Sequence, residues 1–390
     1  MAESTLPQGW TWAGVQGLLA EHADLETSAR DHRAIQRLRV IRSAAQLLRL
    51  LFAYVLSGWS LRTTVGWAQA AGEASLSDQA LNERLRQCGP WLAHLVTSLG
   101  AAVAAQDGAG PAEFDGRCVL AVDATTVASP GGKDKTYRRL HTAYDIGRQR
   151  FHYTELSDRH VAERLDVGKV EAGEIRIGDR CYGRYRDLMS VRAAGADFLV
   201  RLSAKALKLV AADGTPLARA ALCRRAVAAG TQDVAVKVLD TGEGAPLEAR
   251  VIVVPLPPDA AEAARRRMRR KAKKSGYTLS RDALVTASCL MLVTSLPTAA
   301  WPAPRVLELY RLRWQAELAF KRMKSLLDLE RLRSFNTQSV TAWIHVVLLV
   351  ALLIELKRPS MKIGAPVSPR PAPGAARSRS GASSTISPAP

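Results

Sequence analysis

Apolar residues recur at helical spacing through the first hundred residues of the chain. The segment 30–57 combines an apolar stripe with a basic face and predicts one long helix. Two shorter amphipathic segments, 61–71 and 77–87, flank Gly72 and predict a pair of short helices. We therefore expect residues 1–105 to form an all-helical N-terminal domain.

The two short helices have the layout of a helix-turn-helix. In that arrangement the second helix would present Asn82, Arg84 and Arg86 to DNA. Any antiparallel pair of helices shows the same pattern, so a plain helical packing domain explains the segment equally well. The sequence leaves both interpretations open.

The pattern changes to that of β-strands after a break rich in Gly and acidic residues at 106–116. Two of the predicted strands are buried in character, and they end at Asp123 and Asp179. The predicted strands are 118–122, 141–146, 151–156 and 175–178, and a helix follows at 185–194. Residues 106–196 are thus expected to form the first part of an α/β core.

Short strand candidates separated by turn residues recur between 197 and 300, which predicts a β-rich insertion. The predicted strands are 198–202, 234–239, 250–254 and 290–294. Inside this insertion lies the basic run RRRMRRKAKK, residues 265–274. A solvated helix or loop face and a phosphate-binding patch both account for such a run.

Two long helices are predicted at 303–335 and 338–357, and they would complete the core over 301–358. The longest apolar run, 346–354, is too short to span a bilayer, so we expect a buried helix and no membrane association. From 359 to 390 the composition changes to Pro, Ser, Ala, Gly and Arg, which predicts a disordered basic tail.

The balance of charge narrows the class of partner. With 55 Lys and Arg against 36 Asp and Glu, the chain carries +19, which favours a polyanion such as nucleic acid or an anionic membrane surface. The five cysteines are scattered and form no CxxC pair, so zinc ribbons and thioredoxin-type sites are excluded and a reducing compartment is expected. The N-terminus has no basic segment followed by an apolar stretch; we expect no signal peptide and a cytoplasmic location.

Other familiar chemistries find no support in the sequence. His141, His152 and His160 lack the spacing of a histidine metal site, and structural hydrogen bonds are the favoured interpretation for them. No GxSxG elbow occurs. The stretch SPGGKDKT, residues 129–136, lacks the spacing of a P-loop.

Polar residues gather on one face of the predicted helix over 303–335. An α-helix turns by about 100° per residue, so the polar residues of this face fall within a sector of about 60° around the helix axis. These residues are Tyr310, Arg313, Glu317, Lys321 and Lys324. An amphipathic surface helix with an Arg313–Glu317 pair would show the same face. Apolar residues cover most of the remaining circumference, however, and favour a face that lines a site.

Asp123, Asp179 and Glu317 form a candidate set of metal ligands. Either aspartate alone is typical of a turn or a helix cap. Three carboxylates close together repel one another unless divalent cations neutralise them, and hard oxygen ligands suit Mg²⁺ or Mn²⁺. Two such ions, about 3.5–4 Å apart, would clamp the attacking and leaving oxygens of a phosphodiester.

The chain resembles the DDE transposases of the bacterial insertion sequence four family over roughly residues 30–357. The spacing Y-x2-R-x3-E-x6-K of that family is met from Tyr310 to Lys324. The segments VDATT at Asp123 and GDRCYG at Asp179 resemble its two aspartate motifs, and SDRHVAE, residues 157–163, resembles the stretch before the second. The resemblance implies an RNase H-like core, a mixed sheet flanked by helices, interrupted by a β-rich insertion.

The resemblance also implies roles for the candidate residues. Asp123, Asp179 and Glu317 would bind two Mg²⁺ or Mn²⁺ ions, with Asp123 shared between them. DNA phosphates at the transposon end would be held by Tyr310, Arg313, Lys321 and Lys324. Trp314 fits the family pattern as a DNA contact, although its residue type alone favours core packing. Some relatives stack a flipped base on an aromatic residue of the insertion, a role open here to Tyr277 or Trp301.

The implied activity is cut-and-paste DNA transposition. The enzyme would cleave double-stranded DNA at terminal inverted repeats and join the freed 3′-hydroxyl to target DNA, acting as a homodimer on nucleoid DNA in the cytoplasm. Two alternatives remain open from the residues alone. One is a non-transposing nuclease of the same fold, and the other is a catalytically dead DNA-binding remnant, which the unusual tail would suit.

Overall fold

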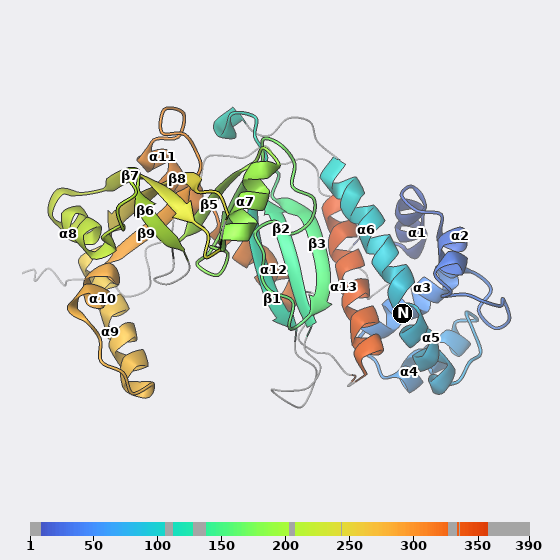
Figure 1. The fold of residues 1–390 in the computed structure, drawn as a ribbon. Helices are drawn as coiled ribbons and strands as arrows, with labels where there is room; N and C mark the ends of the chain where they lie inside the picture. The colour runs from blue at the N-terminus through green and yellow to red at the C-terminus, as the bar shows by residue number, and fades with distance from the viewer. Residues whose placement is uncertain are drawn as a thin grey trace, which may run out of the picture. The chain divides into compact units, whose positions relative to one another are not determined.

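The computed structural model describes residues 9–105, 112–127, 138–202, 207–242, 244–326, 334 and 336–357. Its central feature is a single nine-stranded mixed sheet with the strand order β3-β2-β1-β4-β5-β9-β8-β7-β6. Helices from both ends of the chain pack beside this sheet (Figure 1). The predicted mixed α/β class is confirmed.

Six helices occupy residues 12–105, and no strand occurs among the described residues of that range. They are α1 (Trp12–Ala20), α2 (Leu25–Asp31), α3 (Ala44–Leu56), α4 (Leu61–Ala70), α5 (Asp78–Gln87) and α6 (Gly89–Ala105). The predicted pair of short helices is present as α4 and α5, and Ser77 caps α5 by accepting from the Ala80 amide. Whether this region contacts DNA stays a prediction.

The single long helix predicted over 30–57 is wrong. The chain leaves α2 at His32, and Arg33 adopts a positive φ of 57°, which breaks the helical hydrogen bonding. Helix α3 then begins only after Ser43, whose hydroxyl accepts from the Gln46 amide. Most of the arginines of the supposed basic face therefore lie in a loop.

The first part of the core contains five strands among its described residues: β3, β2 and β1 are neighbours in antiparallel order, and β1, β4 and β5 are neighbours in parallel order. Strand β1 pairs with β2 on one side in antiparallel fashion and with β4 on the other side in parallel, and β4 pairs in parallel with β5. The strands are β1 (Val119–Val127), β2 (Arg138–Asp145), β3 (Arg150–Asp158), β4 (Ile175–Gly178) and β5 (Asp197–Arg201). A short 3₁₀ turn, η2 (Ala112–Phe114), precedes β1, and α7 (Tyr185–Ala193) connects β4 to β5.

The predicted insertion extends the same sheet instead of forming a separate one. Its last strand, β9, pairs antiparallel with β5, and the other strands follow outward from β9. It carries as much helix as strand, so the expectation of a mostly β segment is only half right. The elements are β6 (Lys208–Ala211), α8 (Arg219–Ala229), β7 (Gln232–Leu239), β8 (Leu247–Pro255), α9 (Pro258–Lys274), α10 (Arg281–Thr286) and β9 (Cys289–Thr294).

The helix predicted over 303–335 is broken in the middle. Helix α11 (Ala303–Arg311) ends with Leu312 as its C-cap residue, and α12 (Trp314–Leu326) begins at Trp314. The amides of Leu312 and Arg313 donate to carbonyls three residues earlier in the chain, whereas an α-helix requires four. The chain therefore forms a tight 3₁₀-like turn at this point. Tyr310 and Glu317 therefore lie on two different helices. The prediction that these residues share one face of a single straight helix is wrong.

Helix α13 (Thr337–Lys357) is the buried helix expected near the C-terminus. It packs against α6, α5, α3 and β3, and it runs beside α6 (Figure 1). By length and composition alone this helix could cross a membrane, and the bent pair α5–α6 would pass the same test as one span, but 89% of the tested window of α13 is buried inside the fold. Glu355 on α13 accepts from the Phe151 amide and so ties the helix to β3.

The described residues up to 357 belong to one compact unit, which ends at Pro359. The finer division into domains at 105, 196, 300 and 358 stays a prediction. The predicted disordered tail, 359–390, lies outside the described residues.

Candidate active site

The two predicted aspartates meet because β1 and β4 are parallel neighbours. Their register pairs Ala121 with Ile177, so a step of two residues along both strands reaches Asp123 and Asp179 on the same face. Strand β4 ends at Gly178, and Asp179 follows it as predicted. The prediction that Asp123 ends its strand is wrong, because β1 continues to Val127 against β2. Asp123 thus lies at the point where β1 loses its β4 partner.

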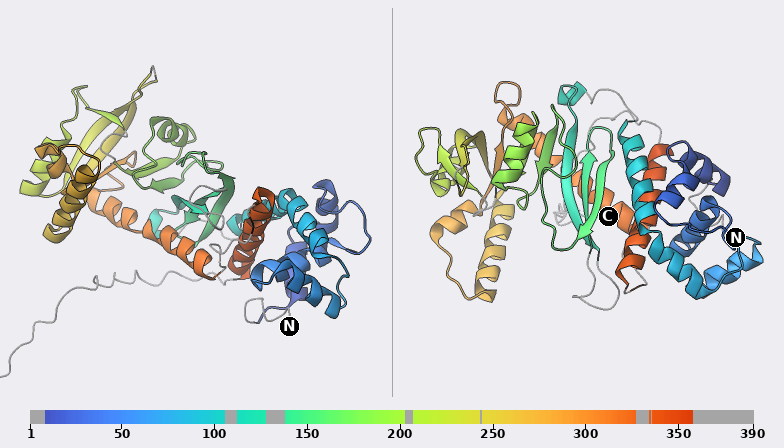
Figure 2. Two further views of the ribbon diagram at one scale, coloured as in Figure 1. Left: turned by 90° about the horizontal axis from the view of Figure 1, so that it is seen from below. Right: turned by 45° about the vertical axis from the view of Figure 1, so that its right-hand side comes forward.

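Helix α12 brings Glu317 to the same face of the sheet. This helix packs against β1, and Figures 1 and 2 both show it running along one side of the strands. Ala316 and Ala319 are buried in one apolar cluster with Val119 and Ala121 of β1. The small side chains of the two alanines allow a close approach of the helix, and Glu317 lies between them in sequence.

The pKa of Asp123 also indicates that Asp179 and Glu317 lie near it. The pKa of its carboxyl group is raised from 3.8 to about 6, chiefly by burial and to a smaller extent by the charges of Asp179 and Glu317. The Ala124 amide and the Arg313 guanidinium act in the opposite direction. Three carboxylates therefore influence one another at this position, with one nearby cation to offset them.

The donor set suits divalent cations. All three groups are carboxylates, the hard oxygen ligands that Mg²⁺ and Mn²⁺ prefer. Their oxygens do not all lie within 4.8 Å of one another, since these three described residues form no such close group. The residues present therefore fit divalent cations by the chemistry of their oxygens.

Arg313 is the cation of this cluster. Its guanidinium donates to the Glu317 carboxylate at 2.8 Å, and its pKa is raised by that hydrogen bond and by the charges of Tyr310, Glu317 and Asp123, which outweigh the opposing effect of burial. The Nε of Arg313 is buried and has no hydrogen-bond partner among the described residues. This buried donor is an unsatisfied polar atom next to the carboxylate cluster.

Tyr310 lies beside the same group. Its ring is 5.9 Å from the Arg313 guanidinium carbon. Burial raises the pKa of its hydroxyl, while the charges of Arg313 and Arg201 lower it and that of Asp179 raises it. Tyr310 therefore joins the aspartates in spite of the break between α11 and α12.

The remaining predicted DNA contacts lie on α12. Trp314, Glu317 and Lys321 are all exposed, so this part of the face is open to solvent, whereas Arg313 at its start is only partly exposed. Trp314 is 49% exposed, which contradicts the core-packing role favoured for its residue type. Lys324 continues the face one turn further along the helix, and its side chain lies outside the described residues.

The two aromatic candidates of the insertion differ in accessibility. Tyr277 is 46% exposed, whereas Trp301 is 2% exposed and packs under the Arg305 guanidinium. Trp301 is therefore unable to stack on a base without leaving the core.

Sequence reasoning missed Tyr182, which packs under the carboxylate cluster. Its ring is buried, and its hydroxyl has no hydrogen-bond partner among the described residues. Burial raises the pKa of this hydroxyl, and the charges of Asp123, Glu163 and Asp179 raise it further. A Cβ on Gly178 would lie 2.6 Å from the Tyr182 Cβ, so the glycine is needed for this packing. The segment GDRCYG carried the signal, because glycine and tyrosine bracket the aspartate.

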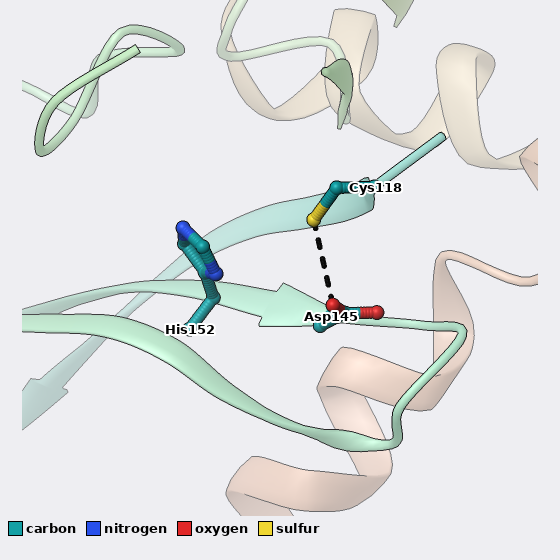
Figure 3. Close-up of side chains that lie close together, drawn as sticks. All are labelled: Cys118, Asp145 and His152. Atoms are coloured by element: carbon teal, nitrogen blue, oxygen red, sulfur yellow. Dashed lines mark hydrogen bonds between the residues drawn. The ribbon is translucent and has the colours of Figure 1, made fainter. Parts of the chain in front are cut away.

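A second group of possible metal ligands lies at the opposite end of β1. Atoms of Cys118, Asp145 and His152 all come within 4.8 Å of one another, and the Cys118 thiol donates to Asp145 at 3.4 Å (Figure 3). His152 also lies 3.8 Å from the carboxylate of Glu174, which directly precedes β4. This group is therefore separated from Asp123 by several residues of strand.

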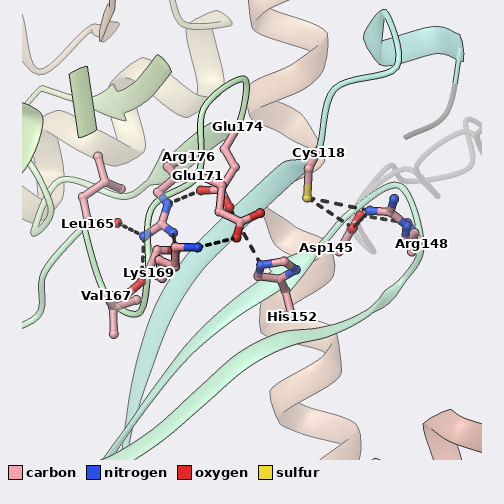
Figure 4. A network of polar contacts seen from close by, with 10 residues as sticks. All are labelled: Cys118, Asp145, Arg148, His152, Leu165, Val167, Lys169, Glu171, Glu174 and Arg176. Atoms are coloured by element: carbon pink, nitrogen blue, oxygen red, sulfur yellow. Dashed lines mark hydrogen bonds and ion pairs between the residues drawn. The ribbon is translucent and has the colours of Figure 1, made fainter. Parts of the chain in front are cut away.

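Arginines already neutralise the carboxylates of this second group. Arg148 pairs with Asp145 at 2.7 Å and lies 3.8 Å from the Cys118 sulfur, while Arg176 pairs with Glu174 at 2.8 Å (Figure 4). We interpret it as a polar network that joins the amino ends of β1 and β4 to the β2–β3 hairpin.

The other histidines behave as the sequence favoured. His141 is buried, and its Nε2 hydrogen-bonds the Ser157 hydroxyl at 2.8 Å across the β2–β3 pair. His160 lies in the loop after β3 beside Arg159. Their structural role is confirmed for His141.

Comparison with known proteins gives consistent matches. The family model of the transposase DDE domain matches residues 115–353. The transposase for insertion sequence element IS421 of Escherichia coli is 38% identical over 349 residues, which cover 88% of this chain and 93% of that protein. InsL of insertion sequence element IS186A from Escherichia coli (strain K12) is 38% identical over 348 residues, with the same coverage. The transposase for insertion sequence element IS231F of Bacillus thuringiensis subsp. israelensis is 32% identical over 83 residues, 21% of this chain and 17% of that protein.

Proposed function

Because this chain belongs to the DDE transposase family, we propose that it cuts and joins DNA at the ends of an insertion sequence through Asp123, Asp179 and Glu317. The observation that carries the assignment is the convergence of these three carboxylates from β1, the end of β4 and α12. Both the enzyme class and the DNA transposase function agree with the named relatives. The alternatives of a non-transposing nuclease and a dead remnant are not favoured.

The three carboxylates would hold two Mg²⁺ or Mn²⁺ ions, with Asp123 shared between them. Bound cations supply Lewis-acid stabilisation of the phosphodiester and lower the pKa of the attacking hydroxyl or water. The chain provides the negative cradle for them. Burial is the main cause of the raised pKa of Asp123, and the charges of Asp179 and Glu317 add to it.

The cationic and phenolic side chains would hold the DNA backbone beside this cradle. Arg313 would supply a guanidinium beside the carboxylates, kept in orientation by its bond to Glu317. Tyr310 would add a neutral donor from the end of α11. Lys321 and Lys324, one and two turns beyond Glu317 on α12, would contact phosphates further along the transposon end, and exposed Trp314 would contact the bases.

The partners are proposed on the same basis. The substrates would be terminal inverted repeats and a double-stranded DNA target. Two chains would act together, because two DNA ends must be held during joining. The protein would act on nucleoid DNA in the cytoplasm, without a membrane.

The direct test incubates the full chain with duplexes that carry its own element's ends in the presence of Mn²⁺. We expect nicks that free 3′-hydroxyl ends, followed by joining of those ends to a target duplex. Glu317→Gln should abolish both steps while end binding persists. Asp282→Asn, a matched change at an exposed carboxylate of α10 that pairs with Arg224, should act like the wild type.

Two outcomes would overturn parts of this proposal. Persistent cleavage by Glu317→Gln would remove Glu317 from the site. Cleavage without any joining would favour the non-transposing nuclease.

A further inference from the structure

Helix α9 is the most strongly charged element of the described structure. Its 17 residues, PDAAEAARRRMRRKAKK, include eight basic and two acidic side chains, a net charge of +6. Glu262 pairs with Arg265 and Arg269. Six cations form no ion pair among the described residues, namely Arg266, Arg267, Arg270, Lys271, Lys273 and Lys274.

The packing of α9 shows that this helix does not serve the core. Only Ala261 and Ala272 are buried, and the helix makes few contacts with other helices and strands. Its C-terminal end points away from the strands of the insertion (Figures 1 and 2). A helix of this length would normally bury an apolar stripe. Here its outer face carries the exposed cations instead.

The charges on α9 also oppose its own folding. Arg266 and Arg270, Arg267 and Lys271, and Arg270 and Lys274 are like-charged pairs at a spacing of four residues, which destabilises a helix. A polyanion bound along this face would remove that repulsion. The unbalanced charge is therefore best explained by a negatively charged partner.

The cations of α9 form one continuous stripe. Arg266, Arg270 and Lys273 fall within a sector of about 60° and span about 10 Å along the helix axis. Their long side chains can therefore reach neighbouring phosphates of a DNA backbone that runs past the helix.

We propose that α9 is a docking surface for the phosphate backbone of duplex DNA, independent of base sequence and separate from the carboxylate site. The proposal rests on the proposed function for the identity of the polyanion. Binding through charge alone predicts equal effects on transposon ends and on unrelated duplexes. Of the two interpretations of the basic run 265–274, a solvated face and a phosphate-binding patch, this proposal favours the phosphate-binding patch.

The test measures the dissociation constant of metal-free full-length protein for its own ends and for a random duplex across a series of salt concentrations. In Arg266→Gln/Arg270→Gln the slope of log K against log salt should fall by up to about 2 on both duplexes, with affinity on the order of tenfold or more weaker at 0.1 M salt. Arg266→Lys/Arg270→Lys should keep the wild-type slope. Lys208→Gln/Arg225→Gln removes the same charge from exposed positions elsewhere in the insertion and should also keep it.

Several results would overturn the proposal. One is an unchanged slope in the glutamine variant, and another is an equal loss of slope in the Lys208→Gln/Arg225→Gln control. A third is loss of binding to phosphatidylglycerol vesicles with DNA binding untouched, which would assign the face to an anionic membrane. Unfolding temperatures should match the wild type, because the altered side chains are exposed.

The outcome is separable from that of the proposed function. Failure of the wild type to cleave its ends would sink the transposase site and leave the salt slopes unaffected. An intact cleavage reaction with unchanged slopes would sink only the role of α9.

Discussion

Asp123 carries its charge in surroundings that disfavour it. The carboxyl is largely buried, and two further carboxylates act on it, so its pKa rises to about 6. Such a group costs stability in the metal-free protein, and a bound cation would recover that stability. The same feature that destabilises the empty cradle is what would make it selective for positive charge.

Asp123→Asn should therefore stabilise the metal-free protein near pH 7. The folded pKa lies above the ordinary value of 3.8, so wild-type stability is lost as pH rises through about 6, and the variant escapes this loss. We expect a gain of about 1–2 kcal/mol at pH 7 and none at pH 4 in chemical denaturation. Mn²⁺ should raise the unfolding temperature of the wild type alone. A variant that is less stable than the wild type at pH 7 would contradict the assigned burial.

Gly178 shows how a missing side chain positions the site. The Tyr182 side chain lies where a Cβ on residue 178 would project. Any larger residue would displace Tyr182 and, with it, the turn that carries Asp179.

Gly178→Ala should lower stability by about 1–3 kcal/mol and reduce cleavage more than DNA binding. Gly66→Ala is the matched control, because Gly66 lies in α4 with nothing within 4 Å of its added Cβ. That control should stabilise the protein by about 0.5–1 kcal/mol. Equal behaviour of the two variants in thermal unfolding would show that Tyr182 can move aside freely.

At the scale of elements, three different contacts between helices and strands position the candidate site. A parallel register aligns the two aspartates, buried alanines seat α12 on β1, and a tight turn connects α11 to α12. Helix α13 packs on the edge strand β3 and on the N-terminal helices, and so joins those helices to the sheet. His345 lies in the buried part of that helix.

His345 should make the fold sensitive to acid. Burial lowers the pKa of its imidazole from 6.5 to about 4, so stability is lost as pH falls from about 6.5 towards 4. The loss from this residue should reach up to about 3 kcal/mol. His345→Gln should flatten that part of the curve of unfolding free energy against pH. An identical curve for the variant would assign the acid sensitivity to other groups.

At the scale of the whole molecule, one sheet connects the core and the insertion. Strand β9 pairs with both β5 and β8, so the basic helix α9 and the carboxylate cluster are built on one continuous set of strands.

Removal of residues 360–390 should leave the fold intact. We expect an unfolding temperature within about 2 °C of the full chain, because the compact unit ends at Pro359. End-specific cleavage should also persist. Aggregation of the truncated protein, or a large fall in its unfolding temperature, would show that the C-terminal segment packs on the core.

The sequence alone determined much of the local structure and predicted the candidate chemistry. Residue types, spacing and the family resemblance predicted Asp123, Asp179 and Glu317 as candidate ligands, because ligand chemistry depends on side-chain identity, which the sequence states directly. The strand end at Asp179 and the buried character of α13 followed from local patterns in the same way.

Only the tertiary structure decided how these parts combine. The continuation of β1 past Asp123 depends on pairing with β2, and the exposure of Trp314 depends on which face of α12 meets the sheet. The break at Leu312 likewise disrupts a face that the periodicity presented as continuous. Contacts between residues far apart in the chain set each of these features, and a periodic pattern along one segment carries no information about its partner.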